Sequence, residues 1–370
     1  MKFSASVAEI AQRLQVAAHV ASGRVGFGAS GGVLVSATEN GVELAATDLE
    51  TSVRLPADAL VQQPGRALVP ARLLLDVIRM APGADVECEL DAADQSLAVR
   101  SKTSTVRLRV LREDDFPALP APPADGGATL PGADFADAVG QVGRAASRDE
   151  TRPLLTGVSL TAEEGRLRVV ATDSYRLAVK EIQLEYQSEP FQVTVPSRAL
   201  TETARLVQQE EAAEVKAATT DNQIIFTINR IMLASRLIDG HFPDYRQLLP
   251  ESVEHELHFV TEELLEVVRR ISLVALKNTP LRLALKEGEL TVSARTPDVG
   301  EGSETMPSEF RGEPLEIGFN PTFLRDGLES VGSPRMVMKL VSALRPGVIE
   351  AEGTEDDGFL YLVMPVRLGV

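Results

Sequence analysis

The chain has 370 residues and a formal net charge of −17, with 44% hydrophobic residues, no tryptophan and one cysteine. This composition excludes wholesale disorder and an intrachain disulfide framework, and it predicts aliphatic cores in two or three domains. The opening MKFSASVAEIAQRLQ lacks an apolar signal segment, and no stretch is long enough to span a membrane. A soluble, cytoplasmic protein is therefore expected.

Helices are predicted, in chain order, over residues 5–24, 71–80, 133–148, 197–208, 261–271 and 322–330, where apolar residues recur at helical spacing. Between the helices lie segments of period-two alternation, such as GRLRVVATD and GELTVSART, bounded by glycine-containing turns. Strands outnumber helices. The pattern indicates an α+β fold in which helices pack on antiparallel sheets.

Several stretches recur at one spacing. AATD, ending at Asp48, returns as VATD, ending at Asp173, about 125 residues later. LVPARLLLDVIRM and REDDFPALP return in the same order as TVPSRALTETARL and IDGHFPDYRQLLP. A weaker third copy contains LTVSART and LEIGFNPTFLRDGL, in which Asn320 replaces the proline.

The repeat predicts three similar domains, at residues 1–120, 129–249 and 250–370, with a linker at 121–128. Each domain is expected to carry two helices on antiparallel sheets. Because unpaired edge strands invite pairing, we expect the domains to join edge to edge, in a curved row that could close into a ring.

The duplicated ATD has a second interpretation, a pair of catalytic carboxylates, Asp48 and Asp173, in a metal-assisted hydrolase. The third copy reads SART without the aspartate, which favours a residue at the end of a strand. GFGASGG, from Gly26 to Gly32, resembles two catalytic motifs, but a predicted helix precedes it and a strand follows, the reverse of the required context.

His255 and His258 alternate within a predicted strand, and no further ligand completes a zinc shell. No catalytic residue, metal site or cofactor is therefore predicted.

The predicted helices carry eleven basic and ten acidic residues, whereas the rest of the chain is strongly acidic. If the helices share one face, that face repels DNA least, and its arginines could contact phosphates without reading bases. Surface helices of ordinary mixed charge are the other interpretation.

VVATDSYRLAV, RPLLTGVSL, LIDGHFPDYRQLLP and the C-terminal YLVMPVRL resemble the bacterial DNA polymerase III beta subunit family, the sliding clamps, across all three predicted domains. The resemblance implies the DNA clamp fold, in which each chain forms half of a closed, head-to-tail homodimeric ring. It implies a non-catalytic processivity subunit that encircles double-stranded DNA without sequence preference and tethers the replicative polymerase.

The implied partners are the polymerase alpha subunit, the clamp loader delta subunit, and other polymerases and DNA repair proteins that carry clamp-binding peptides. No membrane association is implied. The resemblance places a peptide-binding pocket at Leu155, Thr172, Ser174, Tyr175, Arg176, Leu177, Pro243, Gln247, Leu248, Asn320, Leu362, Val363, Met364, Pro365, Val366 and Arg367. This chain departs from the usual pattern of the family at three places. Ser174-Tyr175 stands where Gly-His is common, Gln247 stands where Arg is frequent, and Val366 stands in place of a second Met.

Arg24 matches a DNA contact of the family, and the predicted helices add Arg72, Arg79, Arg144, Arg148, Arg198 and Arg205 as DNA-facing residues. By family position the dimer interface comprises Leu74, Ile78, Arg107 and Leu108 of the first domain, against Leu273, Glu301 and Glu304 of the third. A peptide-binding scaffold that never encircles DNA remains a further alternative.

Overall fold

The computed structural model describes residues 1–21, 31–121, 123, 127–184, 190–250, 252–276, 279–353 and 358–368. The chain forms two compact units. Unit 1 comprises Met1–Thr129 with Gln209–Arg236, and unit 2 comprises Leu130–Gln208 with Leu237–Val370. Arg24 and the first five residues of GFGASGG lie outside the described residues.

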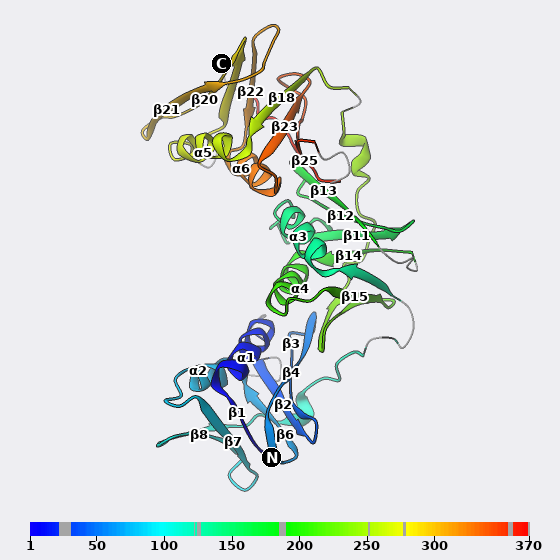
Figure 1. Ribbon diagram of the computed structural model, residues 1–370, viewed down its shortest axis with the longest axis vertical. Coiled ribbons are helices and arrows are strands. Elements are labelled where there is room, and N and C mark those ends of the chain that lie inside the picture. The colour runs from blue at the N-terminus through cyan, green and yellow to red at the C-terminus, as the bar shows by residue number, and fades with distance from the viewer. Residues whose placement is uncertain are drawn as a thin grey trace. The chain divides into compact units, whose positions relative to one another are not determined.

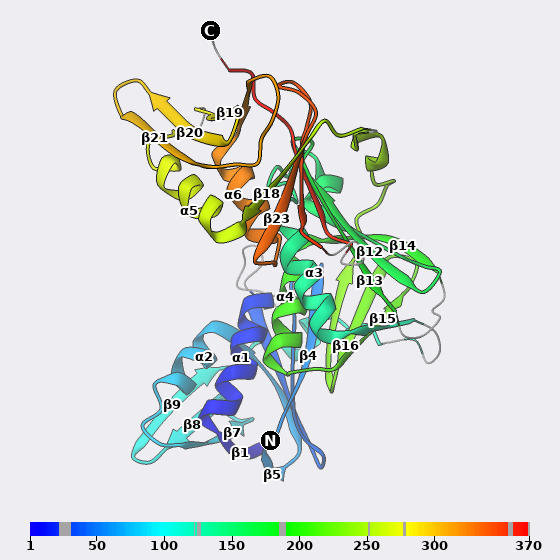
Figure 2. The ribbon, with the colours of Figure 1, turned by 45° about the horizontal axis from the view of Figure 1, so that its top comes forward.

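The first repeat supplies most of unit 1 (Figure 1). Its elements are β1 (Lys2–Ser6), α1 (Val7–Ala21), β2 (Gly32–Thr38), β3 (Gly41–Thr47), β4 (Thr51–Ala57), β5 (Leu60–Gln63), β6 (Gly65–Pro70), α2 (Ala71–Arg79), β7 (Asp85–Asp91), β8 (Ser96–Ser101) and β9 (Ser104–Arg109). Helices α1 and α2 pack against each other, as Figure 2 also shows, and α1 covers β3 and β4.

The second repeat follows the same order over its described residues. Its elements are β10 (Ala128–Pro131), α3 (Gly132–Gly143), β11 (Gly157–Glu163), β12 (Arg166–Thr172), β13 (Arg176–Gln183), β14 (Phe191–Pro196), α4 (Ser197–Gln209), β15 (Glu214–Thr219), β16 (Gln223–Ile228) and β17 (Ile231–Arg236). A short 3₁₀ helix, η3 (Pro153–Thr156), precedes β11.

The third repeat begins after a second 3₁₀ helix, η4 (Tyr245–Leu248). Its elements are β18 (His255–Val260), α5 (Thr261–Ser272), β19 (Leu281–Lys286), β20 (Glu289–Thr296), β21 (Gly300–Pro307), β22 (Leu315–Phe319), α6 (Pro321–Ser330), β23 (Arg335–Leu340), β24 (Gly347–Ala351) and β25 (Leu360–Val363). The six predicted helices therefore coincide with the six α-helices of the described chain, and the threefold order of elements is confirmed.

The strands form antiparallel sheets that run from one repeat into the next. Unit 1 contains the sheet β5-β1-β7-β8-β9 and a sheet in which β15-β16-β17 of the second repeat continues into β4-β3-β2-β6 of the first. In unit 2, β14-β11-β12-β13 of the second repeat continues into β25-β24-β23-β18 of the third, and β21-β20-β19-β22 forms a separate sheet. The expected edge-to-edge joining of the repeats is confirmed.

Local sequence explains where the helices begin and which face they bury. Asn320 accepts hydrogen bonds from the N–H groups of Thr322 and Phe323, and Pro321 occupies the first turn of α6. In α5 the buried residues are Leu264, Leu265, Val267, Val268 and Ile271, an apolar stripe at helical spacing.

The only cysteine, Cys88, is buried in β7, and this burial raises the pKa of its thiol to about 12.

The duplicated Thr-Asp builds the same turn twice. The carboxylates of Asp48 and Asp173 each accept backbone N–H bonds from the residues two and three positions later, at 2.6 to 3.0 Å. The residue after each aspartate has a positive φ, 75° at Leu49 and 80° at Ser174. Both aspartates thus close a strand-to-strand turn, which agrees with repetition rather than with a pair of catalytic acids.

Leu49→Gly should raise the free energy of unfolding by about 0.5–1 kcal/mol, because glycine adopts a positive φ without steric cost and the exposed leucine side chain makes little contact. Urea denaturation measures the change. Leu60→Gly is the matched control. Leu60 is also strongly exposed but lies in a strand, so glycine there should lower stability by about 0.5–1 kcal/mol. A lower free energy of unfolding in both variants would contradict the idea that the positive φ strains the backbone at Leu49.

Candidate functional site

A buried arginine organises the centre of unit 2. Arg176 begins β13, and its Nε donates to Asp173 Oδ2 at 3.0 Å while its Nη1 donates to Asp326 Oδ2 of α6 at 2.5 Å. Its guanidinium lies 4.5 Å from the centre of the Phe323 ring. Burial alone would lower the pKa of Arg176, but Tyr361, Asp326 and Asp173 outweigh burial and raise it. The arginine therefore remains charged, and it ties the second repeat to the third.

Tyr361 completes this arrangement from β25. Its ring is wholly buried, its hydroxyl donates to the Phe323 carbonyl at 2.9 Å, and burial raises the pKa of that hydroxyl. The ring packs so closely on α6 that a Cβ at Gly327 would stand 2.6 Å from it. Phe323, Asp326 and Tyr361 were not predicted from sequence as site residues. Asp326 lies 150 positions from Arg176, and no local pattern signals such a pair.

Apolar side chains form a floor beside this cluster, which we call the apolar floor: Val170, Leu177, Val179, Val348 and Leu362. Phe242, Tyr245, Leu249, Leu360 and Met364 pack against it. Strand pairing aligns Arg176 with Val363 and Leu177 with Leu362. Two predicted pocket residues, Leu177 and Leu362, thus lie in the floor, and Met364 lies beside it.

Exposed apolar side chains lie on segments adjacent in sequence to residues of the apolar floor and its neighbours. Tyr175 is 59% exposed and stacks on Phe323, with ring centroids 6.4 Å apart. Leu248 of η4 and Val366, after β25, are each 38% exposed. The N–H of Met364 donates to the Tyr175 carbonyl at 2.8 Å, so the segment after β25 runs directly beside the Asp173 turn.

The other predicted pocket residues have mainly structural contacts. Thr172 Oγ1 donates to the Arg176 carbonyl at 2.7 Å, and Ser174 accepts a bond from Arg152 at 3.2 Å. Gln247 donates to Asp244 at 3.2 Å. Leu155 and Val363 are buried, Pro365 is half-buried and forms a β-bridge with Phe319, Asn320 caps α6, and Pro243 and Arg367 are exposed.

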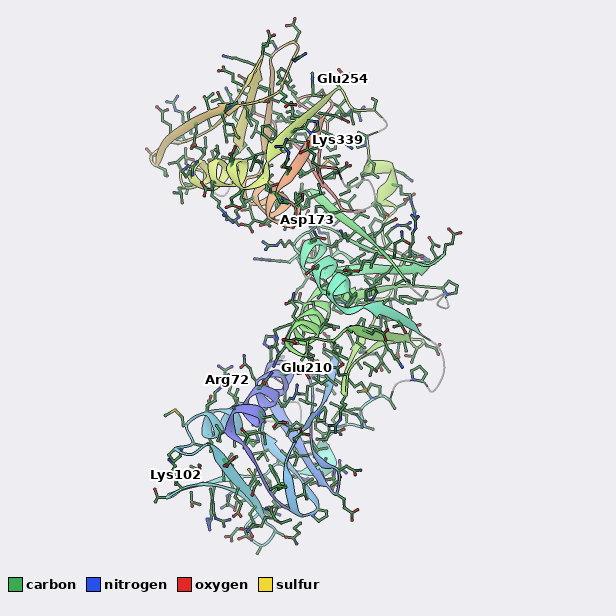
Figure 3. All side chains as sticks on the ribbon, viewed as in Figure 1. Arg72, Lys102, Asp173, Glu210, Glu254 and Lys339 are labelled. Carbon is green, nitrogen blue, oxygen red and sulfur yellow. The ribbon has the colours of Figure 1, made fainter. Side chains whose placement is uncertain are left out.

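The predicted DNA-facing arginines are mostly exposed and mostly paired. Figure 3 shows Arg72 extending from α2 away from the sheets, and Arg79 of the same helix donates to Gln15 at 2.7 Å. In unit 2, Arg148 and Arg198 are exposed, and Arg205 pairs with Glu202 at 2.5 Å.

Carboxylates hold further helix arginines. Arg13 of α1 is bonded to Glu210 within unit 1, and Arg270 of α5 is bonded to Glu266 and Glu304. Individual ion pairs, some of them to carboxylates outside the helices, thus neutralise several of the helix arginines.

Three residues of the predicted dimer interface are buried within unit 1. Leu74, Ile78 and Leu108 are only 3%, 0% and 4% exposed, because α2 and β9 turn them into the core of their own repeat. They offer almost no surface to a partner. Leu273, just after α5, is 82% exposed, and Arg107 and Glu301 are exposed as well, while Glu304 is half-buried and bonded to Arg270.

The described residues contain no group of three or more His, Cys, Asp and Glu side chains that could hold a metal ion. His258 Nδ1 is hydrogen-bonded to Glu352 at 2.8 Å, whereas the ring of His255 lies tilted against Phe310, with ring centroids 4.8 Å apart. Their odd spacing puts the two histidines on opposite faces of β18. None of the described helices has the length and apolar character needed to cross a bilayer.

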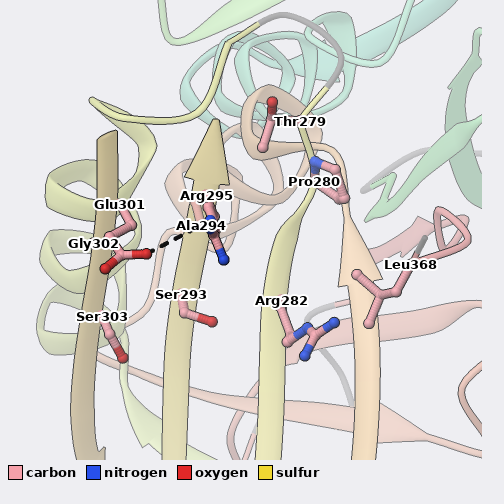
Figure 4. A pocket seen from close by; sticks show the side chains of 10 residues that line it. All are labelled: Thr279, Pro280, Arg282, Ser293, Ala294, Arg295, Glu301, Gly302, Ser303 and Leu368. Carbon is pink, nitrogen blue, oxygen red and sulfur yellow. Dashed lines mark ion pairs between the residues drawn. The ribbon is translucent and has the colours of Figure 1, made fainter. Parts of the chain in front are cut away.

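A cavity of about 650 Å³ lies over the sheet β21-β20-β19-β22 (Figure 4). Its charged groups already have partners. Arg295 pairs with Glu301 at 3.7 Å, and Arg282 with Glu316 at 3.4 Å. The cavity therefore presents surface ion pairs rather than an activated nucleophile or base.

All three parts of the chain match one family. Residues 1–120 match the N-terminal domain of the DNA polymerase III beta subunit, residues 129–244 the central domain and residues 246–367 the C-terminal domain.

Individual relatives agree with this match. A protein of Streptomyces coelicolor described as "Beta sliding clamp" is 32% identical over 357 residues, 91% of each chain. One of Staphylococcus aureus with the same description is 29% identical over 347 residues, again 91% of each. The crystal structure of the DNA polymerase sliding clamp from Bacillus subtilis superposes with a TM-score of 0.92 over 100% of both chains, at 27% identity.

Arg176→Met should lower the free energy of unfolding by about 3–5 kcal/mol, because Asp173 and Asp326 would keep buried charges without their partner. The midpoint of urea denaturation measures this. Arg246→Met is the control. Arg246 is exposed and lies 5.6 Å from the Tyr245 ring, so its loss should change stability by about 0.5 kcal/mol or less. Similar losses in the two variants would refute the role of Arg176.

Proposed function

Because the chain belongs to the DNA polymerase III beta subunit family, the beta sliding clamps, and acts as a DNA sliding clamp, we propose that two copies close head to tail around double-stranded DNA. The ring tethers the replicative polymerase and so confers processivity. It catalyses no reaction itself, requires no cofactor and works in the cytoplasm.

The observation that most strongly supports the ring is that neighbouring repeats are joined in the same way: the last strand of one repeat pairs with an equivalent strand of the preceding repeat. The last strand of the second repeat, β17, pairs with β4 of the first, and the last strand of the third repeat, β25, pairs with the corresponding strand of the second, β13. By the same rule β9, the last strand of the first repeat, requires a partner equivalent to β4 and β13. That equivalent is β21, which like β9 is an edge strand of its sheet.

In a second copy, β21 is free to accept β9, and the reciprocal pairing closes a head-to-tail dimer. The charges agree, because β9 presents the exposed Arg107 and β21 the exposed Glu301. A cavity of about 320 Å³ between α2 and β9 is lined by Met80 and Val106, and the exposed Leu273 is an apolar side chain suited to fill it.

The proposed hold on DNA is topological. Strong binding to DNA requires arginines that are free to bind phosphates and displace the counterions of the DNA. Several helix arginines here instead have carboxylate partners. A closed ring needs only weak contacts, since duplex DNA cannot leave it sideways. Such contacts to the phosphate backbone are independent of sequence.

The apolar floor and its exposed rim support a second role, the docking of extended peptides. Leu248, Val366 and Tyr175 provide apolar contacts, and Met364 adds an adaptable side chain beside the floor. We assign the peptide partners to the polymerase alpha subunit, the clamp loader delta subunit, and other polymerases and repair proteins with clamp-binding peptides. This site, unlike the ring, needs no second copy of the chain.

Leu273→Asp should convert the dimer to a monomer of 39.8 kDa, because the new charge would have to enter an apolar cavity. Light scattering measures the mass. After loading by the cognate clamp loader, the unmodified protein should remain on nicked circular DNA and leave linear DNA, and the variant should remain on neither.

Leu344→Asp is the matched control, because Leu344 is also strongly exposed but lies before β24. It should remain a dimer and stay on circles. A monomeric unmodified protein, or equal retention on circular and linear DNA, would refute the ring and leave a peptide-binding scaffold.

Met364→Ala should weaken binding of a clamp-binding peptide from the polymerase by roughly tenfold, because the floor loses an apolar contact. Fluorescence anisotropy with the labelled peptide measures the affinity, and light scattering should give an unchanged mass. Leu60→Ala, an exposed apolar truncation in unit 1, should leave peptide affinity as it was. Unaltered affinity in Met364→Ala would remove the site from this surface.

A further inference from the structure

Three arginines from three helices of unit 2 converge on one carboxylate. Arg144, at the C-terminus of α3, donates to Glu329 Oε2 at 2.6 Å, and Arg269, in the last turn of α5, donates to Glu329 Oε1 at 3.0 Å. Arg325 of α6 pairs with Glu329 at 4.0 Å. We call these four residues the Glu329 cluster.

The Glu329 cluster has more positive than negative charge. Its other carboxylate contacts are Glu262, which accepts from Arg269 at 3.2 Å, and Asp326, which lies 3.6 Å from Arg325. Asp326 is already bonded to the buried Arg176. Three guanidinium groups thus share Glu329 and the outer Glu262.

In the Glu329 cluster the arginine side chains are more exposed to solvent than the glutamate that they share. The side chains of Arg144, Arg269 and Arg325 are 47%, 47% and 41% exposed, whereas that of Glu329 is 21% exposed. A guanidinium has five N–H donors, and one carboxylate cannot satisfy three such groups. The outer donors therefore remain available to an anion that approaches from solvent.

Glu329 is ionised at neutral pH. Burial alone would raise its pKa, but the hydrogen bond from Arg269 and the charges of the three arginines outweigh burial and lower it. The carboxylate thus competes with any phosphate for the same donors.

We propose that Arg144, Arg269 and Arg325 form a contact site for the phosphates of duplex DNA, and that Glu329 is a built-in competitor that keeps this contact weak. The inference rests on the proposed sliding function and deepens it. A phosphate bound by three free arginines would hold the ring at one place. With Glu329 present, each guanidinium exchanges one acceptor for another at small net cost, so the contact can pass from phosphate to phosphate.

Glu329→Gln tests the competitor directly, because it keeps the size of the side chain and removes its charge. Freeing about one more arginine for phosphate should steepen the slope of log affinity against log salt by about 0.9 and tighten binding by roughly 5- to 10-fold near 0.1 M salt. The measurement is anisotropy of a short fluorescein-labelled duplex with the full-length protein, over a salt series. Diffusion of loaded rings along DNA should slow accordingly.

Glu181→Gln is the matched control. Glu181 of β13 is also held by two arginines, Arg168 at 2.6 Å and Arg166 at 3.4 Å, and is 27% exposed, but it lies on a strand instead of a helix. It should leave the affinity and the salt slope unchanged. Replacing Arg269 and Arg325 together with Gln should weaken binding and make the slope shallower.

Two results would overturn the proposal. If Glu329→Gln lowers the melting temperature while affinity and slope stay as in the unmodified protein, the Glu329 cluster only connects α3 to α5 and α6. If both glutamine variants tighten binding equally, the effect is one of net charge alone. Failure of the ring itself would appear separately, as loss of the unmodified protein from circular DNA, and the comparison on the short duplex would still stand.

Discussion

The ion pairs of Arg176 are the interaction on which most of unit 2 depends. A buried guanidinium is tolerated only where charges and hydrogen bonds compensate its desolvation, and here Asp173, Asp326, Phe323 and Tyr361 do so together. The same contacts orient α6. The first turn of that helix contacts Tyr175 and Arg176 through Phe323, and its last turn carries Glu329, so the buried arginine helps to position both proposed binding surfaces.

Repetition solves a problem that edge strands create. Each repeat leaves strands whose backbone groups need partners, and the chain satisfies them by pairing one repeat with the next. Backbone pairing of this kind is compatible with many side chains, and the three repeats differ widely in sequence. The third copy lacks the aspartate of the Thr-Asp turn, and the hydroxyl of Thr296, at the end of β20, donates instead to the Val274 carbonyl after α5.

Periodicity was sufficient to predict the six helices because it depends on local spacing, and repetition gave the threefold order. The edge-to-edge joining was predicted from the need of edge strands for partners. Burial depends on three-dimensional packing, so no sequence pattern indicated that their own repeat encloses Leu74, Ile78 and Leu108. Their assignment to the dimer interface stays a prediction. The partners of Arg176 and Glu329 are distant in sequence, and glutamate is too common for its position alone to indicate a role. The positions named by family resemblance gather around the apolar floor, but their part in peptide binding remains a prediction.

Cys88 has a practical consequence. Alkylating and maleimide reagents attack the thiolate, and this thiol is both enclosed within β7 and shifted far towards its neutral form. A cysteine introduced elsewhere on the surface would therefore be the sole reactive one in the folded protein. Single fluorophores or crosslinkers could be attached at chosen sites without first replacing the native residue.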